Sequence, residues 1–150
     1  MDAVTYSDDR VIELVNRLLV PLKIPYDQQP LAGEFRVRWT PTIVVLDAER
    51  QEHHRTVGYL APEEFSASLL VGVGKTRFDH GRLEEGLNLF REILAAYPES
   101  GFAPEATYYR GVSLFKKTHD PGQLRETYEE LQTKYPASEW TTRAYPYKLL

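Results

Sequence analysis

The side chains that could carry chemistry in this 150-residue chain are sparse, and one type is missing. The chain has no cysteine, so it contains no thiolate nucleophile, no disulfide bond and no thiolate metal ligand. Four histidines remain. His53 and His54 are neighbours on a predicted strand, where alternation should point them to opposite faces. His80 and His119 fall in predicted turns between helices. We therefore expect no cluster of metal ligands, no metal site and no cofactor.

Other patterns that suggest catalysis have simpler interpretations. Paired glutamates fall in predicted first turns of helices or on exposed faces, at Glu63–Glu64, Glu84–Glu85 and Glu129–Glu130. The segment Gly72–Thr76 has the letters of a phosphate-binding loop but neither the preceding strand nor the spacing of its first glycine. No Ser-His-Asp order stands out. We expect no catalytic residue in the chain.

Charge and hydropathy exclude two classes of partner. The net charge is −4, which does not favour nucleic acid. The imbalance lies in residues 1–70, which carry 7 Lys and Arg against 11 Asp and Glu. No apolar run approaches the ~20 residues that cross a bilayer, and the first residues form no export signal. For the chain as given, we expect a cytoplasmic protein without nucleic-acid or membrane partners.

The first half of the chain alternates helix and strand patterns. A helix should follow Ser7, which suits an N-cap, because apolar residues recur after it at helical spacing. The short apolar run 19–24 suits a buried strand, and 42–46 is a β-branched run typical of a strand covered on both faces. A short helix is predicted within 27–35, a turn at 47–51, a return strand over 52–58, and a helix from Pro62.

Four segments in this order carry a resemblance to a known family. They are Thr5–Asp8 with Val11, Val20–Lys23, Thr40–Thr42, and Gly58–Leu60 with Pro62–Phe65. Over about residues 2–70 the chain resembles the thioredoxin-like family. The resemblance implies that Pro41 is cis and that the backbone beside it pairs with an extended substrate or partner chain. Trp39, Thr40 and Pro41 are therefore candidate peptide-binding residues.

The resemblance departs from the family pattern at two places. The central strand and the Cys-x-x-Cys motif that precede the first helix in this family have no counterpart after Met1. The strands predicted at 19–25 and 42–47 would then pair directly, or another segment or subunit would fill the gap. An unfilled gap exposes strand edges and invites association, so a homo-oligomer is one expectation. The turn also carries Arg50 where the family usually has glycine.

The second half contains an internal repeat. Tyr97-Pro98-Glu99-Ser100 returns as Tyr135-Pro136-Ala137-Ser138, and Gly74 is followed 37 residues later by Gly111. Repeats of this period predict stacked helix pairs. Their spacing resembles tetratricopeptide repeats, with a degenerate second copy. Tyr108 and Tyr109 would line a peptide groove or, more commonly, pack between helices.

The expected fold class is therefore α/β plus α: a truncated thioredoxin-like βαββα unit, packed against a helical hairpin array of tetratricopeptide type. The expected units are residues 1–70 and 71–150, sharing a helix around 62–80. Two functions remain open. One is a non-catalytic scaffold that binds a protein or peptide. The other is a truncated thiol-disulfide oxidoreductase whose active-site segment lies upstream of Met1, which an in-frame Trp-Cys-x-x-Cys before the Met1 codon would reveal.

The absence of cysteine gives a direct prediction. The pure chain, free of added thiols, should not reduce the disulfides of insulin, because it has no sulfur nucleophile. Turbidity of insulin measured with and without the protein checks this, and reduction by the protein alone would contradict it.

Overall fold

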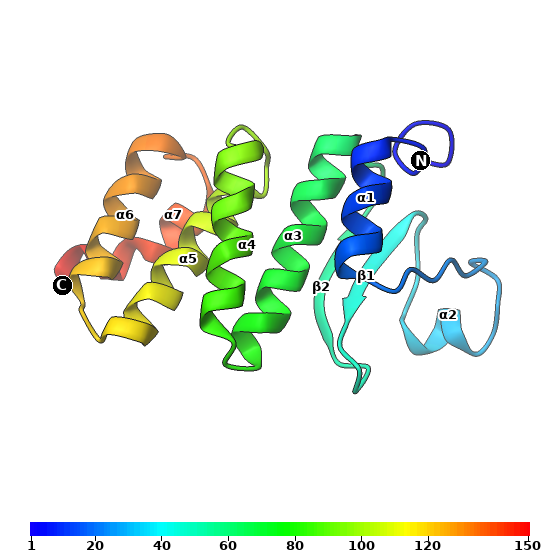
Figure 1. Ribbon diagram of the computed structural model, residues 1–150, viewed down its shortest axis with the longest axis horizontal. Helices are drawn as coiled ribbons and strands as arrows, with labels where there is room; N and C mark the ends of the chain where they lie inside the picture. The colour runs from blue at the N-terminus through cyan, green and yellow to red at the C-terminus, as the bar shows by residue number, and fades with distance from the viewer.

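The chain folds into a helix and a β-hairpin at one end and a row of helices toward the other (Figure 1). The computed structural model describes all 150 residues. The elements are α1 (Asp9–Leu18), α2 (Leu31–Glu34), β1 (Thr42–Leu46), β2 (Glu52–Val57), α3 (Pro62–Asp79), α4 (Leu83–Ala96), α5 (Ala103–Thr118), α6 (Gly122–Lys134), α7 (Glu139–Ala144) and the 3-10 helix η1 (Tyr145–Leu149). The fold is mixed α/β and mostly helical, with the N-terminus beside the hairpin and the C-terminus at the far end.

The N-cap of helix α1 lies one residue after the predicted one. Asp8, rather than Ser7, is the N-cap, and its carboxylate accepts the backbone N–H of Arg10 at 2.9 Å. This satisfies one of the free amides of the first turn. Val11 and Leu14 are buried on the face that α1 turns toward α3.

The segment 19–25 is not a strand, and that prediction is wrong. It runs as an extended loop in which Val20 is 97% and Leu22 79% exposed. No backbone hydrogen bond joins it to β1. An apolar run becomes a strand only where a neighbour pairs with it, and no strand lies beside this one. The expected βαββα unit is therefore reduced to helices around a two-stranded sheet.

The predicted hairpin is present. β1 and β2 pair antiparallel from Thr42↔Val57 to Val45↔His54, with a register shift before Leu46↔Glu52. In the turn, Arg50 has φ 67°, a left-handed conformation that costs a non-glycine residue about 1 kcal/mol. Its guanidinium pairs with Glu34 of α2 at 2.7 Å, which links the turn to the short helix that was predicted within 27–35.

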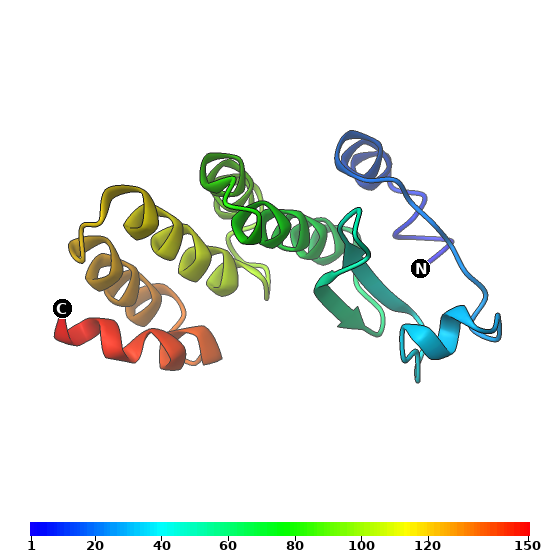
Figure 2. The same cartoon turned by 90° about the horizontal axis from the view of Figure 1, so that it is seen from below.

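Helix α3 is the shared helix predicted around 62–80, and it runs without a break across the expected boundary at 70/71. The hairpin and α1 pack on one side of it and α4 on the other (Figures 1 and 2). Two glycines make these approaches close. A Cβ on Gly72 would lie 2.6 Å from Val45 Cγ2, and a Cβ on Gly74 would lie 2.5 Å from Phe90 Cε1. Residues two apart on a helix point to nearly opposite sides, so the pair serves both interfaces.

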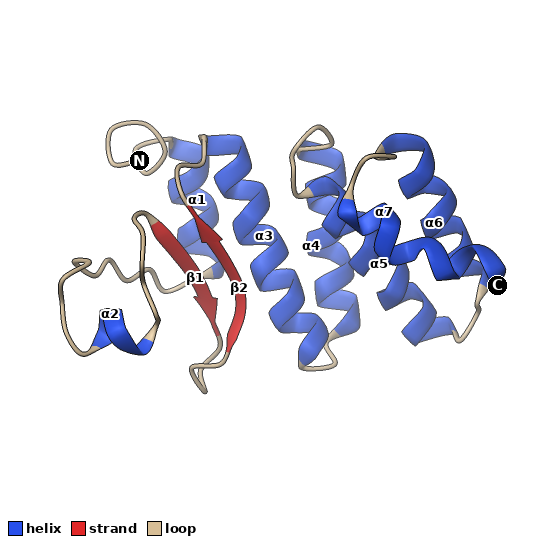
Figure 3. Ribbon diagram, turned by 180° about the vertical axis from the view of Figure 1, so that it is seen from behind, coloured by secondary structure: helices blue, strands red, loops and turns tan.

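Beyond α3, successive helices lie side by side and are joined by short turns (Figure 3). The helix pairs α3–α4 and α5–α6 repeat one contact: Gly74 faces Phe90, and Gly111 faces Thr127, each pair 16 residues apart. Tyr97 and Tyr135, which precede prolines, are the C-caps of α4 and α6. The internal repeat thus corresponds to helix pairs, as its period predicted.

The tight contact at Gly74 gives a stability prediction. Gly74→Ala would force a methyl group against the fully buried Phe90 ring, an overpacking that costs about 1–3 kcal/mol and exceeds the gain of ~1 kcal/mol in helix propensity. Urea unfolding should show a lower midpoint. Gly101→Ala is the control, because its methyl would meet only Glu64 Oε2 at 3.5 Å. Equal midpoints for both variants would contradict the packing argument.

Candidate functional site

The loop that enters β1 holds its backbone in place and leaves its aromatic side chain in solvent. Trp39 is 71% exposed. Its carbonyl accepts the hydroxyl of Thr42 at 2.6 Å, and the carbonyl of Pro41 accepts the N–H of Gly58 at 2.8 Å. The Thr40–Pro41 peptide bond is cis. The two hydrogen bonds make the loop a platform at one end of the hairpin, with an indole available for contact.

Strand β1 has an edge that no strand covers. The sheet contains only β1 and β2, and the loop 19–25 makes no backbone hydrogen bond to β1. Val45 is buried and Ile43 packs against the same core. A strand as apolar as Thr-Ile-Val-Val-Leu is typical of a sheet interior, yet this one lies at an edge. The edge offers unpaired backbone donors and acceptors beside Trp39.

The two candidate tyrosines of the helical half lie elsewhere. Tyr109 packs between helices, with its ring 5.4 Å from that of Phe78 and 5.7 Å from that of Phe90. The Tyr108 hydroxyl hydrogen-bonds with that of Tyr147 at 2.8 Å, and its ring lies 5.2 Å from Trp140. Both tyrosines are half-buried in this aromatic cluster. The structure does not bring them together with the Trp39–Pro41 loop.

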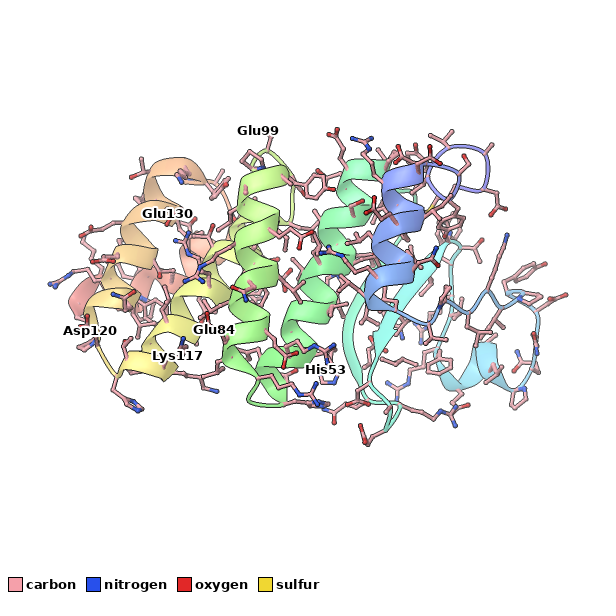
Figure 4. The ribbon with its side chains drawn as sticks, viewed as in Figure 1. His53, Glu84, Glu99, Lys117, Asp120 and Glu130 are labelled. Carbon is pink, nitrogen blue, oxygen red and sulfur yellow. The ribbon has the colours of Figure 1, made fainter.

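A cluster of histidine and aspartate side chains joins the hairpin to the end of α3, so the expectation that no histidines gather is wrong. His53 Nε2 lies 2.9 Å from Asp47 Oδ2, and His80 Nε2 lies 3.2 Å from the same oxygen. His53 Nδ1 lies 2.6 Å from Asp79 Oδ2. Figure 4 shows His53 between the hairpin and the C-terminal end of α3. We call these four residues the His–Asp cluster.

A β-bulge explains why alternation failed for the two neighbouring histidines. Val45 pairs with His54 and Leu46 with Glu52, so His53 is the extra residue of β2. A bulge re-aims side chains. Both imidazoles are buried and both contact α3: His53 meets Asp79, while His54 Nε2 lies 3.0 Å from Ser68 Oγ.

The surroundings of the two imidazoles shift their pKa values in opposite directions. Burial opposes the charged form of His53, but hydrogen bonds with Asp47 and Asp79 outweigh it and raise the pKa of His53. The hydrogen bond from His53, helped by those from the Gln51 amide and from His80, lowers the pKa of Asp47 to about 2. Burial lowers the pKa of His54 to about 4, with the Lys75 charge adding to the effect. His54 is thus a neutral anchor at neutral pH, whereas the neighbouring carboxylates favour the protonated form of His53.

Comparison with known proteins bears on the first half of the chain. The family model of the thioredoxin-like domain matches residues 5–71, a span that holds the Trp39–Pro41 loop and the hairpin. Within this match there is no cysteine, so the chain contains no redox cysteine. No curated protein and no solved structure matched the chain. None of its helices combines the length and apolar character that a membrane span requires.

The His54 anchor gives a second stability prediction. Ser68→Ala leaves a buried imidazole nitrogen without its partner, which costs about 1–3 kcal/mol. Urea unfolding should detect the loss. Thr133→Ala is the matched control, because that exposed hydroxyl bonds only the Glu129 carbonyl of its own helix. An unchanged midpoint for Ser68→Ala would show that the hairpin does not depend on this contact.

Proposed function

We propose that the chain is a non-catalytic scaffold that binds an extended segment of a protein partner along the open edge of β1. The observation that carries the proposal is the lack of a partner at that edge: an apolar strand of interior type has a neighbour on one side only. Strand addition supplies backbone hydrogen bonds for affinity, while neighbouring side chains give specificity. The Trp39–Pro41 loop would lie at one end of the added strand.

The side chains near the loop suggest the chemistry of the partner. Arg38 directly precedes Trp39, and Arg36 lies two residues earlier. Both arginines are exposed, and neither forms an ion pair within the chain. An exposed indole and two unpaired guanidinium groups favour a segment that carries acidic and apolar residues. The partner in this proposal is therefore an acidic extended peptide.

The helical half would serve as the rigid support of this site. Its stacked pairs, which we interpret as tetratricopeptide-like, hold α3 from the side opposite the hairpin. Tyr108 and Tyr109 contribute to packing in this account rather than to a groove. A thiol-disulfide oxidoreductase would need a cysteine that the chain does not contain.

A peptide selection tests the proposal. Displayed 12-residue random peptides would be selected on the tag-free protein, and the binding of one selected peptide would be measured by calorimetry. We expect acidic sequences, and a dissociation constant at least about tenfold weaker for Trp39→Ala, because exposed tryptophans often carry interface energy. Tyr145→Ala is the matched control, since it also removes an exposed aromatic side chain, 56% accessible, but at the far end of the chain.

Amide NMR spectra locate the bound peptide. The account expects the backbone amides of β1 to shift and to become protected from exchange when the peptide is added. Shifts confined to α5 and α6 would place the binding surface on the helices and contradict the proposal. A concentration-dependent dimer that protects β1 without peptide would also contradict it, because a second copy would then be the occupant.

A further inference from the structure

We propose that His53, His80 and Asp47 form a binding site for a divalent transition-metal ion, with Zn²⁺ as the ion that the donors suit best. The three residues supply two imidazole nitrogens and one carboxylate oxygen, which lie within 4.8 Å of one another. Two histidines and one carboxylate are a recurrent set for zinc and other transition metals. This site is separate from the β1 edge, and its test does not depend on peptide binding.

Two of the three distances between donor atoms are close to those of a tetrahedral site, and the third is at most 4.8 Å. Bonds of ~2.0–2.1 Å from zinc to nitrogen or oxygen place the ligand atoms of a tetrahedron about 3.3–3.4 Å apart. Asp47 Oδ2 lies 2.9 Å from His53 Nε2 and 3.2 Å from His80 Nε2. The imidazole rings meet edge to face, with centroids 5.5 Å apart. Small side-chain movements would bring all three atoms onto one ion.

Asp79, the fourth residue of the His–Asp cluster, has the position of a supporting group. Asp79 Oδ2 lies 2.6 Å from Nδ1 of His53, the nitrogen that points away from Asp47. Metal-bound histidines commonly donate their second ring N–H to a carboxylate, which fixes the tautomer and the orientation of the ring. Asp79 would hold His53 in this way and leave Nε2 free for the ion.

The proposed metal site is buried on one side and open to solvent on the other. The side chains of His53 and Asp47 are 2% and 4% exposed, whereas that of His80 is 37% exposed. Asp47 and His80 line a surface pocket together with Thr76 and Arg77. Arg77 pairs with Glu85 at 3.2 Å, which offsets its charge near the pocket. An ion can therefore enter past His80, and solvent can supply the remaining ligand.

Calorimetric titration with ZnCl₂ in a non-coordinating buffer at neutral pH tests the proposal on the whole, tag-free chain. We expect one zinc ion per chain. His80→Ala should weaken binding at least about tenfold, since it removes a direct ligand. His119→Ala is the matched control, because that histidine lies in the turn between α5 and α6. The zinc affinity of this variant should equal that of the unaltered chain. With no cysteine and four histidines, few other sites compete.

His80→Ala is chosen because its ring makes a single hydrogen bond, to Asp47, so the variant should keep its fold, which circular dichroism can verify. X-ray absorption of the zinc-loaded chain gives an independent measurement, with two imidazoles and N/O ligation expected. The absence of saturable binding would overturn the proposal. So would an unchanged affinity in His80→Ala, a loss of binding in His119→Ala, or a spectrum with fewer than two imidazoles.

Discussion

The burial of α3 is the constraint on which both halves of the chain depend. A helix covered on several sides cannot carry large side chains everywhere, because each neighbour must approach its backbone. The middle of α3 meets this requirement with small residues, and Gly72 and Gly74 receive the hairpin and α4 respectively. The two-stranded sheet is too small to be stable alone, so it depends on this helix for its hydrophobic cover.

Both candidate sites follow from how the hairpin lies on α3. Packing of Val45 and His54 against α3 covers one face of the sheet. It leaves the outer edge of β1 without a neighbouring strand. The same packing brings the hairpin turn to the C-terminal end of α3. There the bulged residue His53 meets Asp79, and Asp47 meets His80. Strand edge and His–Asp cluster are thus consequences of one interface.

The elements with local signals could be predicted from the sequence. The β-branched run at 42–46, the turn after it, and the helices opened by Pro62 and Pro104 are specified by residues close in the chain. The strand predicted at 19–25 is wrong because apolar composition suits a strand, whereas a strand also needs a pairing partner that composition does not reveal. Trp39 could be proposed as a candidate because the loop and its resemblance are both local features, and its side chain is exposed.

The His–Asp cluster could not be predicted for the opposite reason. His53 and His80 are 27 residues apart and meet only because α3 returns to the hairpin turn. A bulge then breaks the alternation that predicted His53 and His54 on opposite faces. The one local signal was that Asp47 begins the predicted turn and His53 lies two residues after its end, a geometry in which side chains across a hairpin come close.

Native-state hydrogen exchange across a urea series tests most directly whether α3 unites the two halves. If it does, the slowest amides of β2, α3 and α4 will share one free energy of opening and one dependence on urea, because none of these elements keeps its cover without the others. Exchange of β2 through a separate opening at lower free energy, while α3 and α4 stay protected, would contradict the account.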